Sequence, residues 1–124
     1  MSDKKKNPTK ANLKRAVKRL EEALEKEKTP ISRDSAIKRF ELCYDLAWKA
    51  IKNYAKHEGV ECNSPRSCFK EAYKIELIEY DEKWMEMVDD RNASVHIYRE
   101  EQAEEIYDEL PDYLEMLKKL LNNL

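Results

Sequence analysis

The single glycine in this 124-residue chain, Gly59, is the feature that most limits the folds open to it. Sheet proteins join their strands through tight turns, and glycine reaches the positive φ angles of those turns without a steric penalty. Apolar residues recur instead at the three- and four-residue spacing of amphipathic helices. Charged residues make up 40% of the chain, which suits the solvent-facing sides of such helices. The sequence therefore predicts an all-α fold, an antiparallel bundle of four or five helices.

Boundary residues divide this pattern into five helices. The predicted helices run from about 9 to 28, from about 32 or 34 to 58, from 65 through 75, from 81 onward, and from about 100 to 124. Gly59 can end the second helix, and Pro65 suits the first position of the third. Pro111 is expected to kink or split the last helix. Residues 1–8 are expected to form a disordered charged tail, and residues 9–124 a single domain.

Net charge, hydropathy and cysteine usage limit the partners and the compartment. The formal net charge is −2, so any contact with nucleic acid must come from a local patch or from a second subunit. No apolar run approaches the roughly 20 residues of a membrane span, and the N-terminus lacks the apolar stretch of a signal peptide. We therefore expect a cytoplasmic protein without a membrane segment. Cys43, Cys62 and Cys68 are odd in number and lack CxxC spacing, which predicts reduced thiols and neither a disulfide framework nor a zinc site.

Two charged helix faces could bind partners of opposite charge. A basic row lies on the first helix and consists of Lys10, Lys14, Arg15, Lys18 and Arg19. This row could touch phosphates, although a solvated face is the commoner role of such a pattern. Residues 100–115 hold eight acidic residues and no basic one. That face could be solvated, dock a basic partner, or lie beside the basic first helix.

The stretch DDRNASVHIY, residues 89–98, places polar groups next to an apolar helical stripe. Arg91 occupies a position where the helical spacing calls for an apolar side chain. Tyr98 comes two turns later and shares its face if the helix is continuous, and His96 would flank that stripe.

Two interpretations of this stretch remain open. In the structural one, Arg91 pairs with an acid such as Asp90 or Glu58 and holds helices together, while His96 and Tyr98 pack at the edge of the core. In the functional one, the arginine, the histidine and the tyrosine face a cleft that binds phosphate.

The pattern Arg91-Asn92-x3-His96-x-Tyr98 resembles the signature of HEPN domains. Two longer stretches are similar to the small prokaryotic branch known as nucleotidyltransferase substrate-binding proteins. They are RDSAIKRFELCYDLAWK (33–49) and WMEMVDDRNASVHIY (84–98), within a likeness that covers about residues 10–120. The resemblance implies a helical bundle that forms a homodimer, with the Arg–His pairs of both subunits facing a shared cleft. It also implies a partner, a minimal nucleotidyltransferase encoded by a neighbouring gene.

The resemblance implies a role for each residue of the motif. Members of this type are described as metal-independent endoribonuclease toxins, silenced when the partner transfers AMP to the motif tyrosine, here Tyr98. His96 would serve as acid or base. Arg91 would grip the phosphate and stabilise developing charge, and Asn92 would orient a ribose or phosphate oxygen. RNA carries its own 2′-OH nucleophile, so this chemistry needs no metal or cofactor.

Three classes of function are compatible with the pattern. The chain could be a ribonuclease toxin acting on RNA (tRNA among the candidates), or a non-catalytic subunit that binds a nucleotide or substrate for the partner nucleotidyltransferase. It could also be a structural helical adaptor. The first two both use an Arg–His cleft, and the sequence does not separate them. The adaptor is disfavoured because it has no need for the motif.

Overall fold

The computed structural model describes residues 8–97 and 99–124 and folds them into five α-helices. The helices are α1 (Pro8–Glu25), α2 (Pro30–His57), α3 (Pro65–Lys74), α4 (Lys83–Ser94) and α5 (Glu100–Asn123). The described residues contain no strand, which confirms the predicted all-α bundle. Of the expected tail, residues 1–7 lie outside the described residues, and Pro8 is the first residue of α1. None of the described helices is long and apolar enough to cross a membrane.

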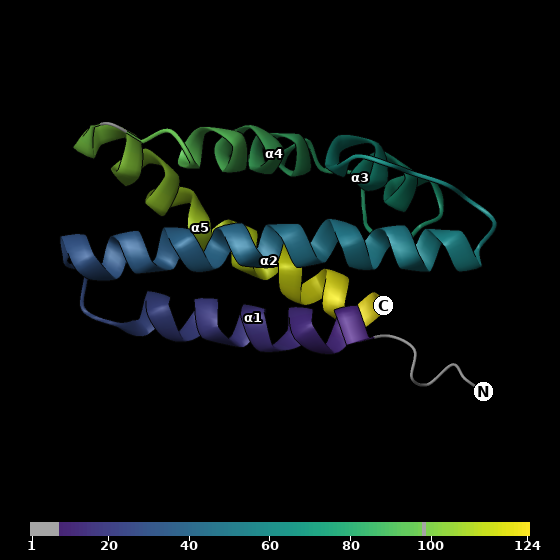
Figure 1. Ribbon diagram of the computed structural model, residues 1–124, viewed down its shortest axis with the longest axis horizontal. Helices are drawn as coiled ribbons and strands as arrows, with labels where there is room; N and C mark the ends of the chain where they lie inside the picture. The colour runs from purple at the N-terminus through teal and green to yellow at the C-terminus, as the bar shows by residue number, and fades with distance from the viewer. Residues whose placement is uncertain (1–7, 98) are drawn as a thin grey trace.

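The central element of the bundle is α2. In Figure 1, α1 runs along one side of it, α3 and α4 lie along the other side, and α5 crosses behind it. α2 packs against all four other helices. Phe40 of α2 stacks on Tyr113 of α5, with ring centroids 5.4 Å apart. Small side chains let neighbouring helices approach closely. Four buried residues of α2 are alanines: Ala36, Ala47, Ala50 and Ala55.

Capping residues explain where α2 begins and ends. Thr29 Oγ1 accepts a hydrogen bond from the Ser32 amide at 3.0 Å, and the Ser32 hydroxyl oxygen accepts one from the Thr29 amide at 2.8 Å. The helix therefore begins at Pro30, earlier than the predicted start, because proline suits the first helical position. Gly59 adopts a φ of 81° just beyond the last turn, which confirms it as the predicted stop. In α5, the helix continues through Pro111 without being split.

The fourth helix is shorter than predicted, because α4 ends at Ser94. The Ser94 hydroxyl oxygen lies 2.8 Å from the Arg91 carbonyl oxygen and 2.5 Å from a carboxylate oxygen of Glu41 in α2. The Arg91 carbonyl is the acceptor that the amide of residue 95 would use in a continuing helix, so the serine competes with helix propagation. The expected continuous helix from Arg91 to Tyr98 is therefore wrong, and Tyr98 itself lies outside the described residues.

The prediction of three reduced thiols is also wrong. Cys62 and Cys68 form a disulfide that ties the segment between α2 and α3 to the first turns of α3. The turn before α3 brings their Cα atoms to 5.0 Å, within the range that a disulfide spans. A search for CxxC spacing misses such a pair because the turn sets the distance. Cys43 is a free, buried cysteine, and burial raises the pKa of its thiol to about 12.

Several carboxylates on the acidic face of α5 are paired with cations from elsewhere in the bundle. Arg33 of α2, whose side chain is 7% exposed, contacts Glu100 at 2.5 Å and Glu104 at 3.0 Å. These carboxylates raise the pKa of the Arg33 guanidinium. Lys83 at the start of α4 contacts Glu109 at 2.5 Å. The acidic face therefore helps to hold α5 against α2 and α4.

Candidate functional site

Arg91 lies in the last turn of α4, where this helix packs against α2. Its side chain is 25% exposed, and its Nη2 is 3.5 Å from Asp45 Oδ1. The guanidinium carbon is 5.7 Å from the ring centroid of Tyr44. The partner of Arg91 is therefore Asp45, not Asp90 or Glu58 as the structural interpretation suggested.

Arg91 has a hydrogen-bonding capacity that the protein leaves unused. Its Nε is buried, and neither that atom nor the buried hydroxyl oxygen of Tyr44 has a hydrogen-bond partner within the described part of the chain. An unpaired buried donor costs about 1–3 kcal/mol, so native proteins rarely keep one without a use. Burial raises the pKa of the Tyr44 phenol to about 12, which keeps it a neutral hydroxyl.

Asp90 is half-buried and makes a contact separate from that of Arg91. Its Oδ2 accepts a hydrogen bond from the hydroxyl of Tyr113 in α5 at 2.5 Å. Burial raises the pKa of the Asp90 carboxyl, and the Tyr113 bond opposes that rise. Adjacent residues on α4 thus serve different purposes: Asp90 joins α4 to α5, while Arg91 joins α4 to α2.

The other motif residues lie at the same end of α4 as Arg91. Asn92 is an exposed residue of its last turn, and His96 is exposed two residues beyond the helix end. Because the helix stops at Ser94, helical geometry no longer fixes the angle between His96 and Arg91. The predicted modification site, Tyr98, falls outside the described residues. Three of the four predicted site residues, Arg91, Asn92 and His96, therefore lie at the end of α4 and in the connection that follows it.

Two acidic residues of α2 hold this end of α4, and the sequence analysis gave them no role. Asp45 contacts Arg91, and Glu41 accepts from the Ser94 hydroxyl. They lie one helical turn apart on α2, so both carboxylates face the same turn of α4. Glu41 is only 12% exposed at its side chain, an uncommon environment for a glutamate. The sequence pattern that could have predicted them is a pair of acidic residues spaced i and i+4 on the most apolar helix.

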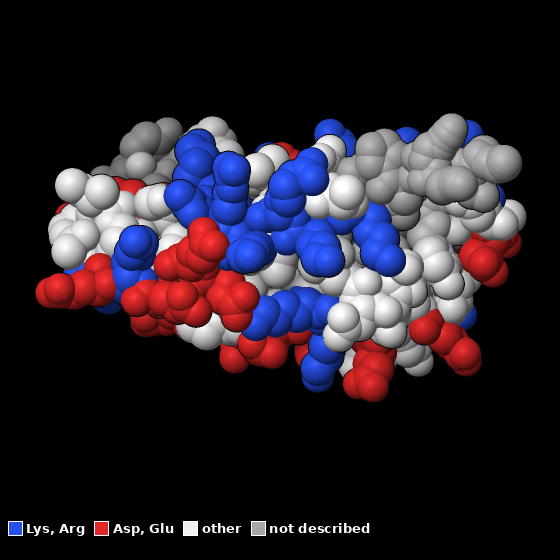
Figure 2. Space-filling model, turned by 90° about the horizontal axis from the view of Figure 1, so that it is seen from below, with Lys and Arg blue, Asp and Glu red and all other residues white. Residues whose placement is uncertain are grey.

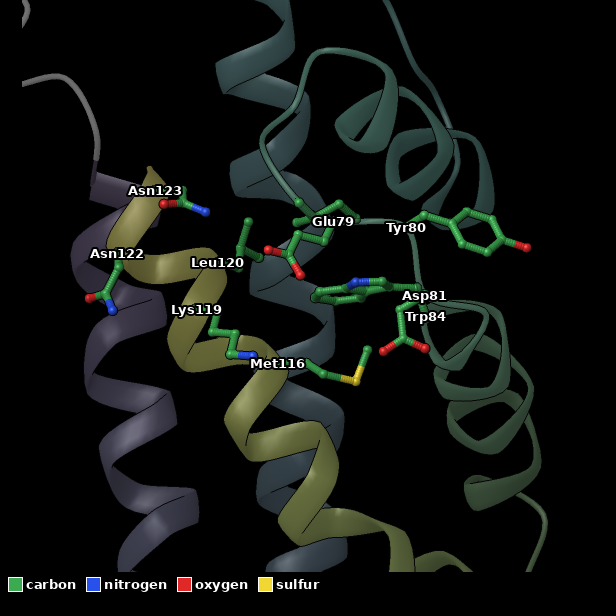
Figure 3. Close-up of a pocket in the computed structure, with 10 residues that line it drawn as sticks. Glu79, Tyr80, Asp81, Trp84, Met116, Lys119, Leu120, Asn122 and Asn123 are labelled. Atoms are coloured by element: carbon green, nitrogen blue, oxygen red, sulfur yellow. The ribbon is translucent and has the colours of Figure 1, made fainter.

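The cavities beside Trp84 lie away from the motif residues. Two cavities, of about 300 and 560 Å³, share the segment between α3 and α4 and the side chain of Trp84. Figure 3 shows the smaller one, where the Trp84 ring lies between Glu79 above it and Met116 below it, with Lys119 to the left on α5. Neither cavity is lined by Arg91, Asn92 or His96.

Comparison with known families identifies the group to which this fold belongs. The sequence profile described as "Nucleotidyltransferase substrate binding protein like" matches residues 10–124. The chain belongs to this family. Membership in the nucleotidyltransferase substrate-binding family confirms the resemblance drawn from the Arg91 motif and from the α2 sequence.

Individual relatives agree with this family. A curated protein of Haemophilus influenzae (strain ATCC 51907 / DSM 11121 / KW20 / Rd), named "Probable ribonuclease HepT", is 29% identical over 94 residues, or 72% of this chain. This chain spans 64% of the length of that relative. A crystal structure from Thermus thermophilus is 35% identical, with a TM-score of 0.83 over 89% of this chain and 96% of that chain.

A second solved structure shares the fold alone. It comes from Haemophilus influenzae and is described as revealing the fold of a substrate binding domain of a nucleotidyltransferase. It is 23% identical, with a TM-score of 0.81, and covers 92% of this chain and 97% of that chain. The names of the relatives thus point to two activities, RNA cleavage and binding for a nucleotidyltransferase.

Proposed function

We propose that this chain is the HEPN subunit of a two-component system and acts as a cytoplasmic RNA endonuclease that needs no metal. The second component is a minimal nucleotidyltransferase, which silences the endonuclease by attaching AMP to Tyr98. The observation that carries the proposal is the environment of Arg91. Asp45 contacts its guanidinium, a quarter of its side chain remains exposed to a ligand, and the exposed His96 follows it closely in the chain. Residues 9–124 are proposed to act as one domain, and a relative named as a ribonuclease supports the activity.

The proposed reaction uses the hydroxyl that RNA itself carries. A histidine removes the proton from the 2′-OH, and the oxygen attacks the adjacent phosphorus. The 5′-oxygen leaves with a proton from a second acid, giving a 2′,3′-cyclic phosphate and a 5′-hydroxyl. Arg91 donates to the phosphate oxygens as negative charge builds up, and in this proposal Asn92 orients the ribose or phosphate.

A homodimer would supply the second acid, because each chain offers one histidine in the motif. Two exposed apolar side chains lie beside the candidate site: Leu42 of α2 is 52% exposed, and Val95, next to Ser94, is 50% exposed. Apolar groups at this position suit an interface between subunits. We propose that the end of α4 lies near the two-fold axis, so that both His96 residues face one cleft.

A second function has a specific observation in its favour. The family is named for substrate binding, and a structure with the same fold is described as part of a nucleotidyltransferase. In this alternative the Arg91 site binds a nucleotide or substrate for the partner enzyme without cleaving RNA. Both versions share the partner, which a neighbouring gene would encode.

Expression in cells tests the proposal against this alternative. The chain is produced in a bacterial host with and without the neighbouring nucleotidyltransferase. A ribonuclease toxin should arrest growth when produced alone, and Arg91→Ala or His96→Ala should relieve the arrest at equal protein levels. Normal growth with the unmodified chain alone, together with tight binding to the nucleotidyltransferase, would favour the non-catalytic subunit.

A further inference from the structure

Charges of opposite sign are segregated along α1. Its first twelve residues, 8–19, contain five basic side chains and no acid, whereas its last six, 20–25, contain three acids and no base. Figure 2 looks onto the molecule from the α1 side and shows Lys and Arg gathered in the middle, with Asp and Glu concentrated to the left. We define the α1 basic face as the exposed residues Lys14, Arg15, Lys18 and Arg19.

This arrangement opposes the intrinsic preferences of a helix. The N-terminal end of a helix carries partial positive charge and favours acidic side chains, while the C-terminal end favours basic ones. α1 has no acid in its first turn and no base in its last. Lys14 and Lys18 are also spaced four residues apart, as are Arg15 and Arg19, and like charges at this spacing repel one another. The four residues of the basic face lie in the middle of α1, beyond the terminal turns where the dipole acts, so their like-charge spacing is what disfavours them. Helix stability therefore does not explain the basic face.

The α1 basic face also lacks partners within the protein. None of its four residues forms an ion pair among the described residues, and Arg15 donates only to the side chain of Asn12 in its own helix. Several other cations of the bundle have carboxylate partners: Lys28, Arg33, Lys83, Arg91 and Lys118. Four unneutralised cations on one short surface are suited to an external polyanion.

Basic residues of α2 connect this face to the candidate site. Arg39 Nη1 donates to the Arg19 carbonyl oxygen at 2.9 Å, so its guanidinium lies at the edge of α1. α2 lies between α1 and α4, and its exposed residues include Lys49, four residues after Asp45, and Lys38, which pairs with Glu41 at 3.2 Å. A phosphate backbone that leaves Arg91 can therefore cross α2 and reach α1 over a surface that carries basic groups.

We propose that the α1 basic face binds the phosphate backbone of RNA and holds a segment that flanks the one at Arg91. The identification of the polyanion as RNA rests on the proposed ribonuclease function. Contacts to phosphate carry no sequence information, so this face contributes affinity and placement without base specificity. A partner protein with an acidic surface is the competing occupant, and the experiment below distinguishes the two.

The test measures RNA affinity separately from cleavage. Fluorescence anisotropy of a 2′-O-methyl RNA oligonucleotide, which lacks the attacking hydroxyl, is recorded at several salt concentrations. One variant replaces the α1 basic face: Lys14→Gln, Arg15→Gln, Lys18→Gln and Arg19→Gln. A matched control removes four exposed cations from other surfaces: Lys26→Gln, Lys70→Gln, Lys74→Gln and Lys119→Gln.

The α1 variant should bind RNA about tenfold more weakly or worse at low salt, and its log–log salt slope should become less negative by about two to three units. The control should keep most of the affinity. The melting temperature of the α1 variant should equal or exceed that of the wild type, because the replaced side chains form like-charge pairs at i,i+4 that repel one another. An equal loss of affinity in both variants, or no RNA binding by the wild type, overturns the inference.

Two further outcomes separate this inference from its alternatives. If the α1 variant keeps its RNA affinity but loses binding to the purified nucleotidyltransferase, the face docks a protein and the inference fails. In the second outcome, the α1 variant loses affinity for the 2′-O-methyl RNA, while His96→Ala still cleaves ordinary RNA at the wild-type rate. This result would support RNA binding by the α1 basic face and contradict the proposed catalytic role of His96.

Discussion

At the scale of single residues, the proposed cleavage mechanism requires Asp45 to hold Arg91 in place. Asp45→Asn keeps the shape of the side chain but removes the charge that orients the guanidinium. The ion pair is partly exposed, so its loss should change the unfolding free energy by less than about 1 kcal/mol. We expect RNA cleavage to fall by about tenfold, since small displacements of a positioned group are costly to catalysis.

A matched control exists on the neighbouring pair of helices. Asp89 contacts Arg66 at 3.1 Å in an exposed ion pair between α4 and α3. Asp89→Asn makes the same chemical change near the same helix end and should leave the cleavage rate unchanged. Equal activity in Asp45→Asn and the wild type would show that Arg91 needs no positioning by α2.

The role proposed for Tyr98 is also a prediction about one residue. Incubation of the chain with the neighbouring nucleotidyltransferase and ATP should attach AMP to Tyr98, which mass spectrometry can map. The added phosphate is anionic and would compete with substrate phosphate for Arg91, so the modified protein should be inactive. Tyr98→Phe should remain active after the same treatment. An adduct on Tyr80 or Tyr107 instead would contradict this role.

At the scale of helices, most of the fold was predictable because helical spacing of apolar residues is a local signal. The sequence predicted five helices, the end of the second helix at Gly59, and a resemblance to the family along nearly the whole chain. The end of α4 did not, because it depends on a contact between Ser94 and Glu41 that are 53 residues apart in the chain. The Cys62–Cys68 disulfide and the Asp45–Arg91 ion pair could not be predicted from the sequence either, because both depend on how the chain is folded.

The end of α3 gives a stability prediction at this scale. Glu76 follows the helix with a φ of 62°, a left-handed conformation that glycine adopts more readily than other residues. The substitution Glu76→Gly should therefore raise the unfolding free energy by about 0.5–1 kcal/mol, the relieved left-handed strain less the added chain entropy, measured by urea unfolding. Glu79→Gly is the control: Glu79 is exposed in the same linker without a positive φ, so added chain entropy should lower stability. Destabilisation by both changes would mean that the Glu76 side chain contributes more than its backbone strain costs.

At the scale of the whole molecule, the proposed dimer supplies what one chain lacks, a second histidine. Light scattering at micromolar concentration should give the mass of two chains. Leu42→Asp should produce a monomer, because it places a charge in the proposed interface. Ile31→Asp is the control, since Ile31 is an 82% exposed apolar residue at the start of the same helix, and it should leave the dimer intact. A wild-type monomer at this concentration would remove the shared cleft from the mechanism.

The proposed RNA cleavage by Arg91 and His96 is tested most directly by identifying the products that the purified protein makes from RNA. An RNA oligonucleotide is incubated with the chain in the presence of EDTA, and the products are identified by mass spectrometry. The fragments should end in a 2′,3′-cyclic phosphate and a 5′-hydroxyl. Arg91→Ala and His96→Ala should not cleave the RNA, and their circular dichroism should match the wild type. A requirement for a divalent metal, or cleavage by His96→Ala at the wild-type rate, would contradict the proposed mechanism.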